Sequence, residues 1–535
     1  MLKASNRDYT WILLLLLVVA ELIINPVGEF PLNDDWAFSK VISTYINSGL
    51  FRFSDWQSLP LAPQLFSGIV LAKLFGFSFT LLRLISVTSL LILILICNSI
   101  LKQLSFTPVL RFIVLFCLAF NPLTLSLSNT FLPDVFTLLL ALLAFLFMLK
   151  IFKLFNGLHF ALLILFSTLA TLNRQTSIVL PIAFGIIYYF QFGKSIRSLL
   201  IASIPILINI IGLVAFQYIA LTDHNLPVNY QLQLQHIVQS ALQPNLVAAK
   251  TFFYYFTCSN VMLGLFILPL TVSNLREHFN KIISSLSLIL IGIGYMLLII
   301  SKITFAANIF PFSGNMFYPF GVGPIIMTGF NTQDLHAFSL ASKTFWGALN
   351  ILGGFSFYAA SISIVCAKNK VASPILIFFI IIFIIYLMPL CLSYTNDRYL
   401  LFLIPFFFIA YILSFDFQFN KLWLGATFTF MLLFSTATTH DYLNINRARW
   451  SATDKLISVK HISPKNIDGG FEFNGWYSDG FKNYNPLHQG RWWWIEDDTY
   501  IISPEPMKGY AVEESIHFSS FISFRFNTLY VLKRN

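Results

Sequence analysis

The feature that most limits how this chain can fold is a series of apolar segments, each long enough to cross a lipid bilayer. A spanning helix needs about 20 mostly apolar residues. Segments of this kind lie near residues 10–27, 79–101, 108–126, 133–153, 158–173, 176–193, 198–220, 250–272, 282–302, 343–366, 372–394, 399–415 and 421–439. Only 10% of the residues are charged, whereas a soluble domain carries roughly 25%. The sequence therefore predicts a polytopic α-helical membrane protein with about 13 transmembrane helices.

The loops between these segments alternate in charge. With the N-terminus on the inner side of the membrane, every inner loop carries lysine or arginine, which is the distribution that cytoplasmic loops show. The basic residues concerned are Lys3, Arg7, Lys102, Arg111, Lys150, Lys153, Lys194, Arg197, Arg276, Lys281, Lys368, Lys370 and Lys421. An odd number of spans then places the polar tail on the outer side. We expect the net charge of +10 to reflect membrane orientation, with no nucleic-acid partner.

Two parts of the sequence differ in composition. Residues 1–439 hold all the apolar segments and form the predicted transmembrane domain, whose first outer loop, 28–78, contains one amphipathic and one short apolar helix. Residues 440–535 are polar, and their turn residues and alternating runs predict a small outer β or α/β domain with one helix near 447–460. Within it, "WWWIEDD" at 492–498 fits an interfacial aromatic patch better than a sugar-stacking site.

Several charged residues fall at the outer ends of the predicted spans. They are Asp34 and Asp35 after the first span, Arg83 at the start of the second, Asp134 at the start of the fourth, Arg174 at the end of the fifth, and Asp397 and Arg398 at the start of the twelfth. Each has a simpler interpretation as a solvated boundary residue, a helix cap or an arginine that snorkels to the lipid surface. Together, acids and arginines at one membrane face suit chemistry on a lipid-linked phosphate.

Short motifs at these positions resemble the GT-C membrane glycosyltransferases, including the protein O-mannosyltransferase-like (glycosyltransferase family 39-like) and aminoarabinose-transferase-like families. "PLNDDWAFSKV" resembles the acidic motif of their first outer loop, and "NTFLPDVFTLLLALLAF" resembles their second acidic motif, at the start of the fourth span. "LAKLFGFSFTLLRLISVTSLLILIL", "ATLNRQTSIVLPIAF" and "NDRYLLFLIPF" are also similar. The resemblance covers about the first 200 residues and, loosely, 395–410. The chain departs from the aminoarabinose-transferase-like pattern at "SLPLAP", where those members carry an acidic-basic-Pro-Pro stretch, and this argues against that substrate.

The resemblance implies a GT-C-like bundle that transfers a sugar from a polyprenyl-phosphate donor to a lipid, glycan or protein acceptor by an inverting single displacement. It implies a site at the outer face of a bacterial inner membrane, with the C-terminal domain in the periplasm. Asp34 would be the general base, since an acceptor hydroxyl needs to lose its proton as it attacks, and Asp35 would orient the site or bind the acceptor. Arg83, Arg174 or Arg398 would neutralise the phosphate. Asp134 would bind the acceptor or hold an arginine, and Asp397 would belong to the residues that bind the acceptor or the donor.

Two other functions stay open on the sequence. A ligase or polymerase of lipid-linked glycans would use the same donor chemistry. A transporter or flippase would place its charges near the membrane midplane, on broken helices in repeated halves, and no such repeat is visible. The five cysteines lie in apolar segments without a CxxC pair, so neither a disulfide framework nor a zinc site is expected. No cofactor is expected either, and a divalent metal ion stays an open alternative.

Overall fold

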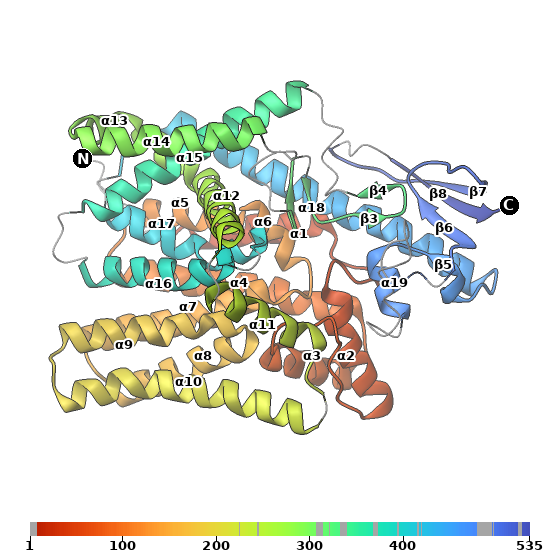
Figure 1. The fold of residues 1–535 in the computed structure, drawn as a ribbon, viewed down its shortest axis with the longest axis horizontal. Coiled ribbons are helices and arrows are strands. Elements are labelled where there is room, and N and C mark those ends of the chain that lie inside the picture. The colour runs from red at the N-terminus through yellow and green to blue at the C-terminus, as the bar shows by residue number, and fades with distance from the viewer. Residues whose placement is uncertain are drawn as a thin grey trace.

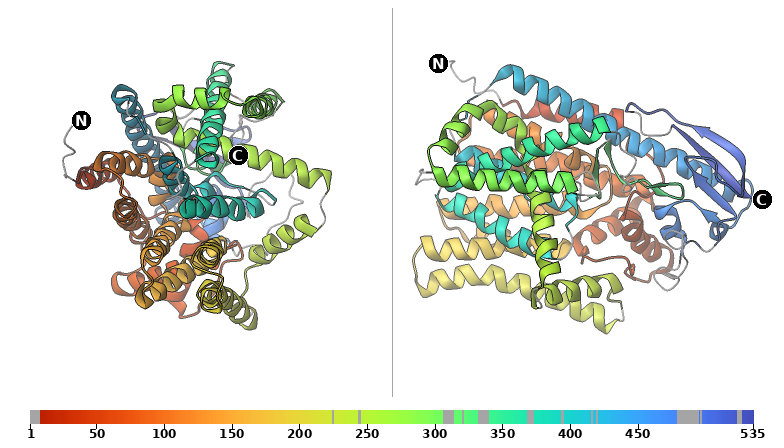
Figure 2. Two further views of the ribbon diagram at one scale, coloured as in Figure 1. Left: turned by 90° about the vertical axis from the view of Figure 1, so that its left-hand side faces the viewer. Right: turned by 45° about the horizontal axis from the view of Figure 1, so that its top comes forward.

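The computed structural model describes residues 8–223, 225–242, 245–305, 314–319, 321–331, 340–367, 373–392, 395–414, 417–418, 420–478, 495, 497–522 and 527–535. Most of them form long helices that lie side by side, with a small sheet at one end of the bundle (Figure 1). Viewed along the bundle, many helices are seen end-on, so they run roughly parallel (Figure 2). The C-terminal end of the chain lies at the end of the bundle that carries the sheet (Figure 1).

Each predicted apolar segment contains a helix, but the count of thirteen full spans is not confirmed. Within the described residues, eight helices are long and apolar enough to cross a membrane, or nine if one bent pair counts as a single span. The eight are α4 (Phe79–Gln103), α7 (Pro133–Lys153), α10 (Ile196–Thr222), α12 (Leu246–Thr271), α14 (Leu286–Phe305), α15 (Leu340–Val365), α16 (Ser373–Leu392) and α18 (Lys421–Ser458). The chain is therefore a polytopic α-helical membrane protein.

The remaining predicted spans contain shorter helices. These are α1 (Thr10–Ile24), α8 (Gly157–Asn173), α9 (Val179–Gln191) and α17 (Ile404–Leu413), of 15, 17, 13 and 10 residues. Two of them follow 3-10 turns, η1 (Gln175–Ile178) before α9 and η4 (Asp397–Phe402) before α17. The helices are short because the chain leaves the α conformation near the outer polar residues, as Arg174 does with its extended backbone.

The bent pair replaces the single span predicted at 108–126. Its helices, α5 (Pro108–Ala119) and α6 (Pro122–Ser128), meet at 62°. Pro122 has no N–H to continue the hydrogen bonding of α5, and the Asn121 side chain instead begins α6 by accepting from the Leu123 N–H at 2.9 Å. Proline and asparagine therefore divide this apolar segment in two.

The outer loops contain short elements of their own. The first loop forms α2 (Asp35–Ser48) and α3 (Ala62–Phe75), as predicted. Gly49 ends α2 with φ of 72°, a left-handed conformation that glycine adopts without strain. The later predicted outer loops contain α11 (Val228–Leu242) and the hairpins β1 (Phe317–Tyr318) with β2 (Gly321–Val322) and β3 (Ile326–Met327) with β4 (Phe330–Asn331). The predicted inner loop between them contains η2 (Val272–Asn274) and α13 (Leu275–Ile283).

The tail forms a four-stranded sheet with one helix beside it. The strands lie in the order β5-β6-β8-β7, with β5 parallel to β6 and the other pairs antiparallel. The elements are η5 (Pro464–Asn466), β5 (Ile467–Asp468), α19 (Phe471–Tyr477), β6 (Tyr500–Ser503), β7 (Tyr510–His517) and β8 (Thr528–Arg534). Of the "WWWIEDD" segment, residues 492–494 and 496 lie outside the described residues.

The boundary predicted between residues 439 and 440 falls inside a helix. α18 runs unbroken through Ser458, so the helix predicted near 447–460 is the outer end of the last apolar helix. The sequence from 440 to 458 contains neither glycine nor proline, and so nothing in it ends the helix at the membrane surface. The bundle and the tail therefore share one rigid element.

Candidate active site

A polar cavity of about 330 Å³ lies where the first outer loop, the loop with the β hairpins and the tail meet. In Figure 1 this is the end of the bundle that carries α2, α19 and β3. Five amide side chains line the cavity: Asn33, Asn229, Gln233, Asn315 and Asn396. Amides and aromatic rings supply the hydrogen bonds and the flat apolar faces that a sugar ring can use.

Asp34 lies in the cavity wall, directly before the first residue of α2. The indole N–H of Trp56 donates to its Oδ1 at 2.9 Å, and Nη2 of Arg398 donates to its Oδ2 at 2.7 Å. Its side chain keeps 13% of its exposure. A carboxylate held by two donors and still open to the cavity can meet a substrate hydroxyl.

Arg398 is the positive charge of the same wall. Among the described residues, its Nε and Nη1 have no hydrogen-bond partner, although its side chain is only 8% exposed. An unpaired buried donor is costly, and the forked guanidinium fits a phosphate. The Tyr399 ring, also in the cavity wall, lies 5.5 Å from the Arg398 guanidinium carbon.

Arg174 and Asp134 form a second buried ion pair, and the arginine of this pair contacts the Tyr399 ring. Arg174 Nη1 lies 2.9 Å from Asp134 Oδ1, with side chains 5% and 1% exposed. The Arg174 guanidinium carbon is 4.7 Å from the centre of the Tyr399 ring. Neither member of the pair lines the cavity, so the pair contacts the cavity wall through Tyr399.

Asp35 and Asp397 are bonded to backbone groups and do not line the cavity. Asp35 accepts from the Leu32 N–H at 2.5 Å and from the Phe131 N–H at 3.1 Å, and burial raises the pKa of its carboxyl to about 8. Asp397 accepts from the N–H of Met316 at 3.0 Å and, at 2.6 Å, from that of the next residue. Each carboxyl fastens one loop to the bundle.

Arg83 has a similar position under the first loop. It is buried, and it donates to the carbonyl oxygens of Pro26, Gly28 and Phe30. Its guanidinium carbon lies 5.0 Å from the centre of the Phe30 ring. The structure therefore brings Asp34 and Arg398 together in the cavity, sets Asp134 and Arg174 beside it, and occupies Arg83, Asp35 and Asp397 with backbone groups.

Sequence reasoning missed most of the cavity wall. Tyr399 directly follows Arg398, so an aromatic residue beside a selected charge was an available signal, whereas Trp56 stands apart in the sequence from every selected residue. Asn229 reaches the site because its side chain donates to the Trp56 carbonyl at 2.9 Å. Phe471, whose ring centre is 5.8 Å from that of Trp56, comes from the tail and had no signal in the sequence.

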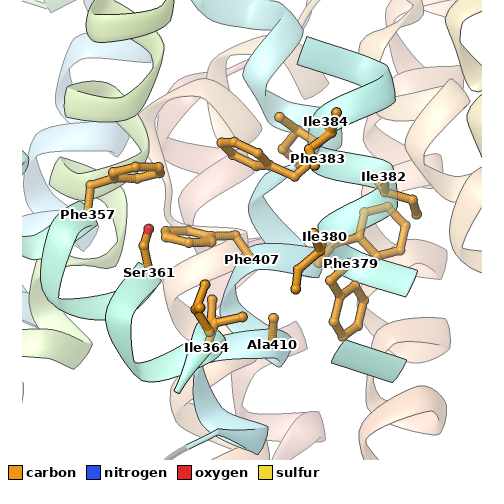
Figure 3. A pocket seen from close by; sticks show the side chains of 13 residues that line it. Phe357, Ser361, Ile364, Phe379, Ile380, Ile382, Phe383, Ile384, Phe407 and Ala410 are labelled. Atoms are coloured by element: carbon orange, nitrogen blue, oxygen red, sulfur yellow. The ribbon is translucent and has the colours of Figure 1, made fainter. Parts of the chain in front are cut away.

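A second hollow in the bundle differs in chemistry. It is a cleft of about 240 Å³ between α15, α16 and α17, which Figure 3 shows with phenylalanine and isoleucine side chains around it. Of the described residues that line it, only Ser361 has a polar side chain. Among the described residues that line it, none carries a carboxylate or a cationic side chain.

The charged side chains in and around the polar cavity determine which ligands it could bind. Within the described residues, no group of three or more His, Cys, Asp or Glu side chains is placed to hold a metal ion. In the cavity wall, one carboxylate, that of Asp34, is paired with one guanidinium, that of Arg398. A second guanidinium, that of Arg174, contacts the Tyr399 ring. The positive charge available for an anionic ligand among these residues is that of the arginines.

Comparisons with known proteins return structural likeness only. No protein-family model matches, and no curated protein matches. ArnT from Cupriavidus metallidurans bound to undecaprenyl phosphate is 13% identical, with a TM-score of 0.41, over 87% of this chain and 85% of that one. The archaeal oligosaccharyltransferase AglB from Archaeoglobus fulgidus, in complex with an inhibitory peptide and a dolichol-phosphate, is 13% identical, with a TM-score of 0.39, over 84% and 58%.

The arabinosyltransferase EmbB from Mycobacterium smegmatis is 10% identical, with a TM-score of 0.33, over 84% of this chain and 43% of that one. All three are GT-C glycosyltransferases, the superfamily that the sequence motifs resemble. At TM-scores this low, the likeness assigns no role to any residue.

Proposed function

We propose that this chain is a GT-C-type membrane glycosyltransferase that transfers a sugar from a polyprenyl-phosphate donor to an acceptor hydroxyl at the outer membrane face. The observation that carries the proposal is the pair in the polar cavity: a partly exposed carboxylate, Asp34, 2.7 Å from a guanidinium, Arg398, that has spare donors among the described residues. One group suits a proton transfer and the other suits a phosphate.

In the proposed step, Asp34 takes the proton of the acceptor hydroxyl as the oxygen attacks the anomeric carbon of the donor sugar. The new bond joins that carbon to the acceptor oxygen. The bond from the same carbon to the phosphate oxygen breaks, and its electron pair leaves with the polyprenyl phosphate. Attack opposite the leaving group inverts the anomeric centre. Arg398 offsets the charge that develops on the phosphate.

The ion pair prepares Asp34 and Arg398 for this reaction. Nη2 of Arg398 stays on Asp34, and Nε and Nη1 are left to bind phosphate oxygens. The Trp56 N–H holds the other carboxylate oxygen and so limits rotation of the side chain. Arg174 and Asp134 form a net-neutral ion pair, and its arginine contacts the Tyr399 ring and so supports the position of that ring beside Arg398. We expect the sugar and the acceptor to carry hydroxyl groups that can hydrogen-bond to the amide side chains of the cavity.

Turnover of a labelled donor tests the proposal. Purified protein in lipid vesicles would be incubated with a polyprenyl-phosphate sugar labelled in both the sugar and the lipid, together with candidate acceptors. We expect release of the free polyprenyl phosphate together with transfer of the sugar to an acceptor. Movement of intact donor lipid between leaflets, with no bond cleavage for any acceptor, would overturn the proposal and indicate a flippase.

A further inference from the structure

The tail helix α19 packs directly on α2, the helix that begins beside Asp34. The two helices approach so closely that a Cβ atom at Gly475 would lie 2.5 Å from the ring of Trp36. Nζ of Lys40, on α2, donates to the Ser478 carbonyl at 2.5 Å, beyond the C-terminal end of α19. Phe471, at the start of α19, lies against both Trp36 and Trp56. The tail therefore meets the first loop at the cavity.

Glu472 makes a second polar contact between the tail and the first loop, next to Asp34. Its Oε1 accepts from the backbone N–H of Asn33 at 3.1 Å, and its Oε2 accepts from Nη2 of Arg449 at 2.6 Å. Both side chains of this pair are 1% exposed. Arg449 belongs to α18, the long helix that joins the bundle to the tail. A rigid helix thus orients Glu472, and Glu472 holds the residue that precedes Asp34.

Asn33 needs such a contact because its backbone is strained. Its φ is 54°, in the left-handed region, which costs a residue with a side chain energy unless its surroundings compensate. Asparagine tolerates this region better than most residues. Its side-chain Nδ2 donates to Asn315 Oδ1 at 2.8 Å. The tail and the hairpin loop therefore both hold Asn33, and the direction of the chain at Asn33 sets where Asp34 points.

From these contacts we infer that Glu472 of the tail is a positioning residue for Asp34: it fixes the left-handed turn at Asn33 and so aims the carboxylate at the acceptor. This inference rests on the role proposed above for Asp34. It gives the tail a part in the reaction without a catalytic group of its own. Because a misplacement of about 1 Å can cost about a hundredfold in rate, loss of the contact lowers the transfer rate and leaves donor binding at Arg398 intact.

A matched pair of double variants isolates the hydrogen bond to Asn33. Arg449→Met with Glu472→Gln removes both charges and keeps an oxygen that can accept from the Asn33 N–H. Arg449→Met with Glu472→Met removes both charges and that oxygen. Replacing a buried ion pair by apolar residues of similar volume is often tolerated, so both variants are expected to fold. They differ only in the group that faces Asn33.

We expect the glutamine variant to transfer sugar within about threefold of wild type. The methionine variant should be slower by about ten- to a hundredfold in kcat, with an unchanged Kd for the donor lipid. A purely structural role would lower the melting temperature of both variants alike and leave the rate per folded molecule unchanged. Equal rates for the two folded variants would overturn the inference.

Hydrogen exchange on the wild-type protein supplies a test that needs no variant. The contact predicts that the amide of Asn33 exchanges as slowly as those of α2, and rapid exchange at Asn33 alone would overturn the inference. Asp34→Asn in the same assays separates this inference from the proposed function. If Asp34→Asn transfers sugar normally, the base role proposed for Asp34 fails, and this inference fails with it. If Asp34→Asn is inactive and the two double variants are equal, only the positioning role fails.

Discussion

Two ion pairs at the same end of the bundle have almost the same N–O distance, but one lines a cavity and the other is fully buried. Arg398 lies 2.7 Å from Asp34, and Arg449 lies 2.6 Å from Glu472. The first pair lines the polar cavity and keeps 8% and 13% of its side-chain exposure. The second pair is 1% exposed on both sides, and its carboxylate also holds a backbone N–H. The contact distance therefore does not distinguish the pair that lines the cavity from the pair that is fully buried.

The difference between the pairs lies in what else each can reach. When one member of a cavity-lining ion pair is removed or turns to a ligand, solvent or substrate can bind the remaining charge. Neither can reach a sealed pair, and removing one member leaves an uncompensated charge in a site without water. Substitutions at the cavity pair should therefore change the reaction, and substitutions at the sealed pair should first change stability.

The largest expected effect is that of Asp34→Asn on the transfer rate. Asparagine keeps the size of the side chain but cannot accept the proton, and general-base catalysis contributes about 10²–10⁴-fold in rate. We expect a loss in that range with donor affinity retained, as measured by single-turnover transfer and donor binding on the same preparation.

Asp441→Asn is the matched control for this variant. Asp441 is a buried carboxyl that accepts from Ser520 Oγ and from the N–H of Phe521 and Ile522, away from the cavity. We expect it to lower stability and to leave the rate of the folded protein near that of wild type. A rate loss of equal size in both variants would remove the distinction between the two kinds of carboxylate.

The next effect is on the free energy of unfolding. Arg449→Met leaves Glu472 buried without its cation, and breaking a buried pair in this way costs about 3–5 kcal/mol. Adding Glu472→Gln to the same chain should restore most of that loss, because it removes the unpaired charge. Denaturant titration in detergent measures both variants. If Arg449→Met is as stable as wild type, the pair is not sealed.

Arg398→Ala should act on the donor. A hydrogen bond to a charged group contributes about 1.5–3 kcal/mol, which corresponds to about ten- to a hundredfold in donor affinity. Arg398→Lys keeps the charge without the fork and should recover part of the loss. Donor Kd for the three proteins measures this. Unchanged affinity in Arg398→Ala would mean that the phosphate lies elsewhere.

Trp56→Phe should have the smallest effect. It removes the N–H that holds Asp34 Oδ1 and keeps an aromatic ring, and a hydrogen bond of this kind contributes about 1–2 kcal/mol. A loss of about tenfold in kcat is expected. Trp423→Phe serves as the control, since within the described residues the indole N–H of Trp423 has no hydrogen-bond partner. Equal rates in the two variants would show that the Trp56 hydrogen bond does not orient Asp34.

The sequence predicted the bundle and the face that carries the charged residues, because apolar runs and basic loops depend on local composition. It could not decide which of the adjacent Asp34 and Asp35 faces the cavity, since that choice depends on the N–H of Phe131, in the connection between α6 and α7. It could not predict the contact between Asn33 and Glu472, which are 439 residues apart. The shorter helices and the bent pair were not predicted either, because hydropathy averaged along a segment does not show where the helix is interrupted.

An experimental structure with a polyprenyl-phosphate sugar bound would show whether Asp34 and Arg398 act on the donor and acceptor as proposed. We predict a phosphate oxygen on Nε or Nη1 of Arg398, and the anomeric carbon placed so that an acceptor hydroxyl lies about 3 Å from Asp34. We also predict Glu472 still bonded to the Asn33 N–H. A phosphate bound away from Arg398, with the sugar out of reach of Asp34, would contradict these roles.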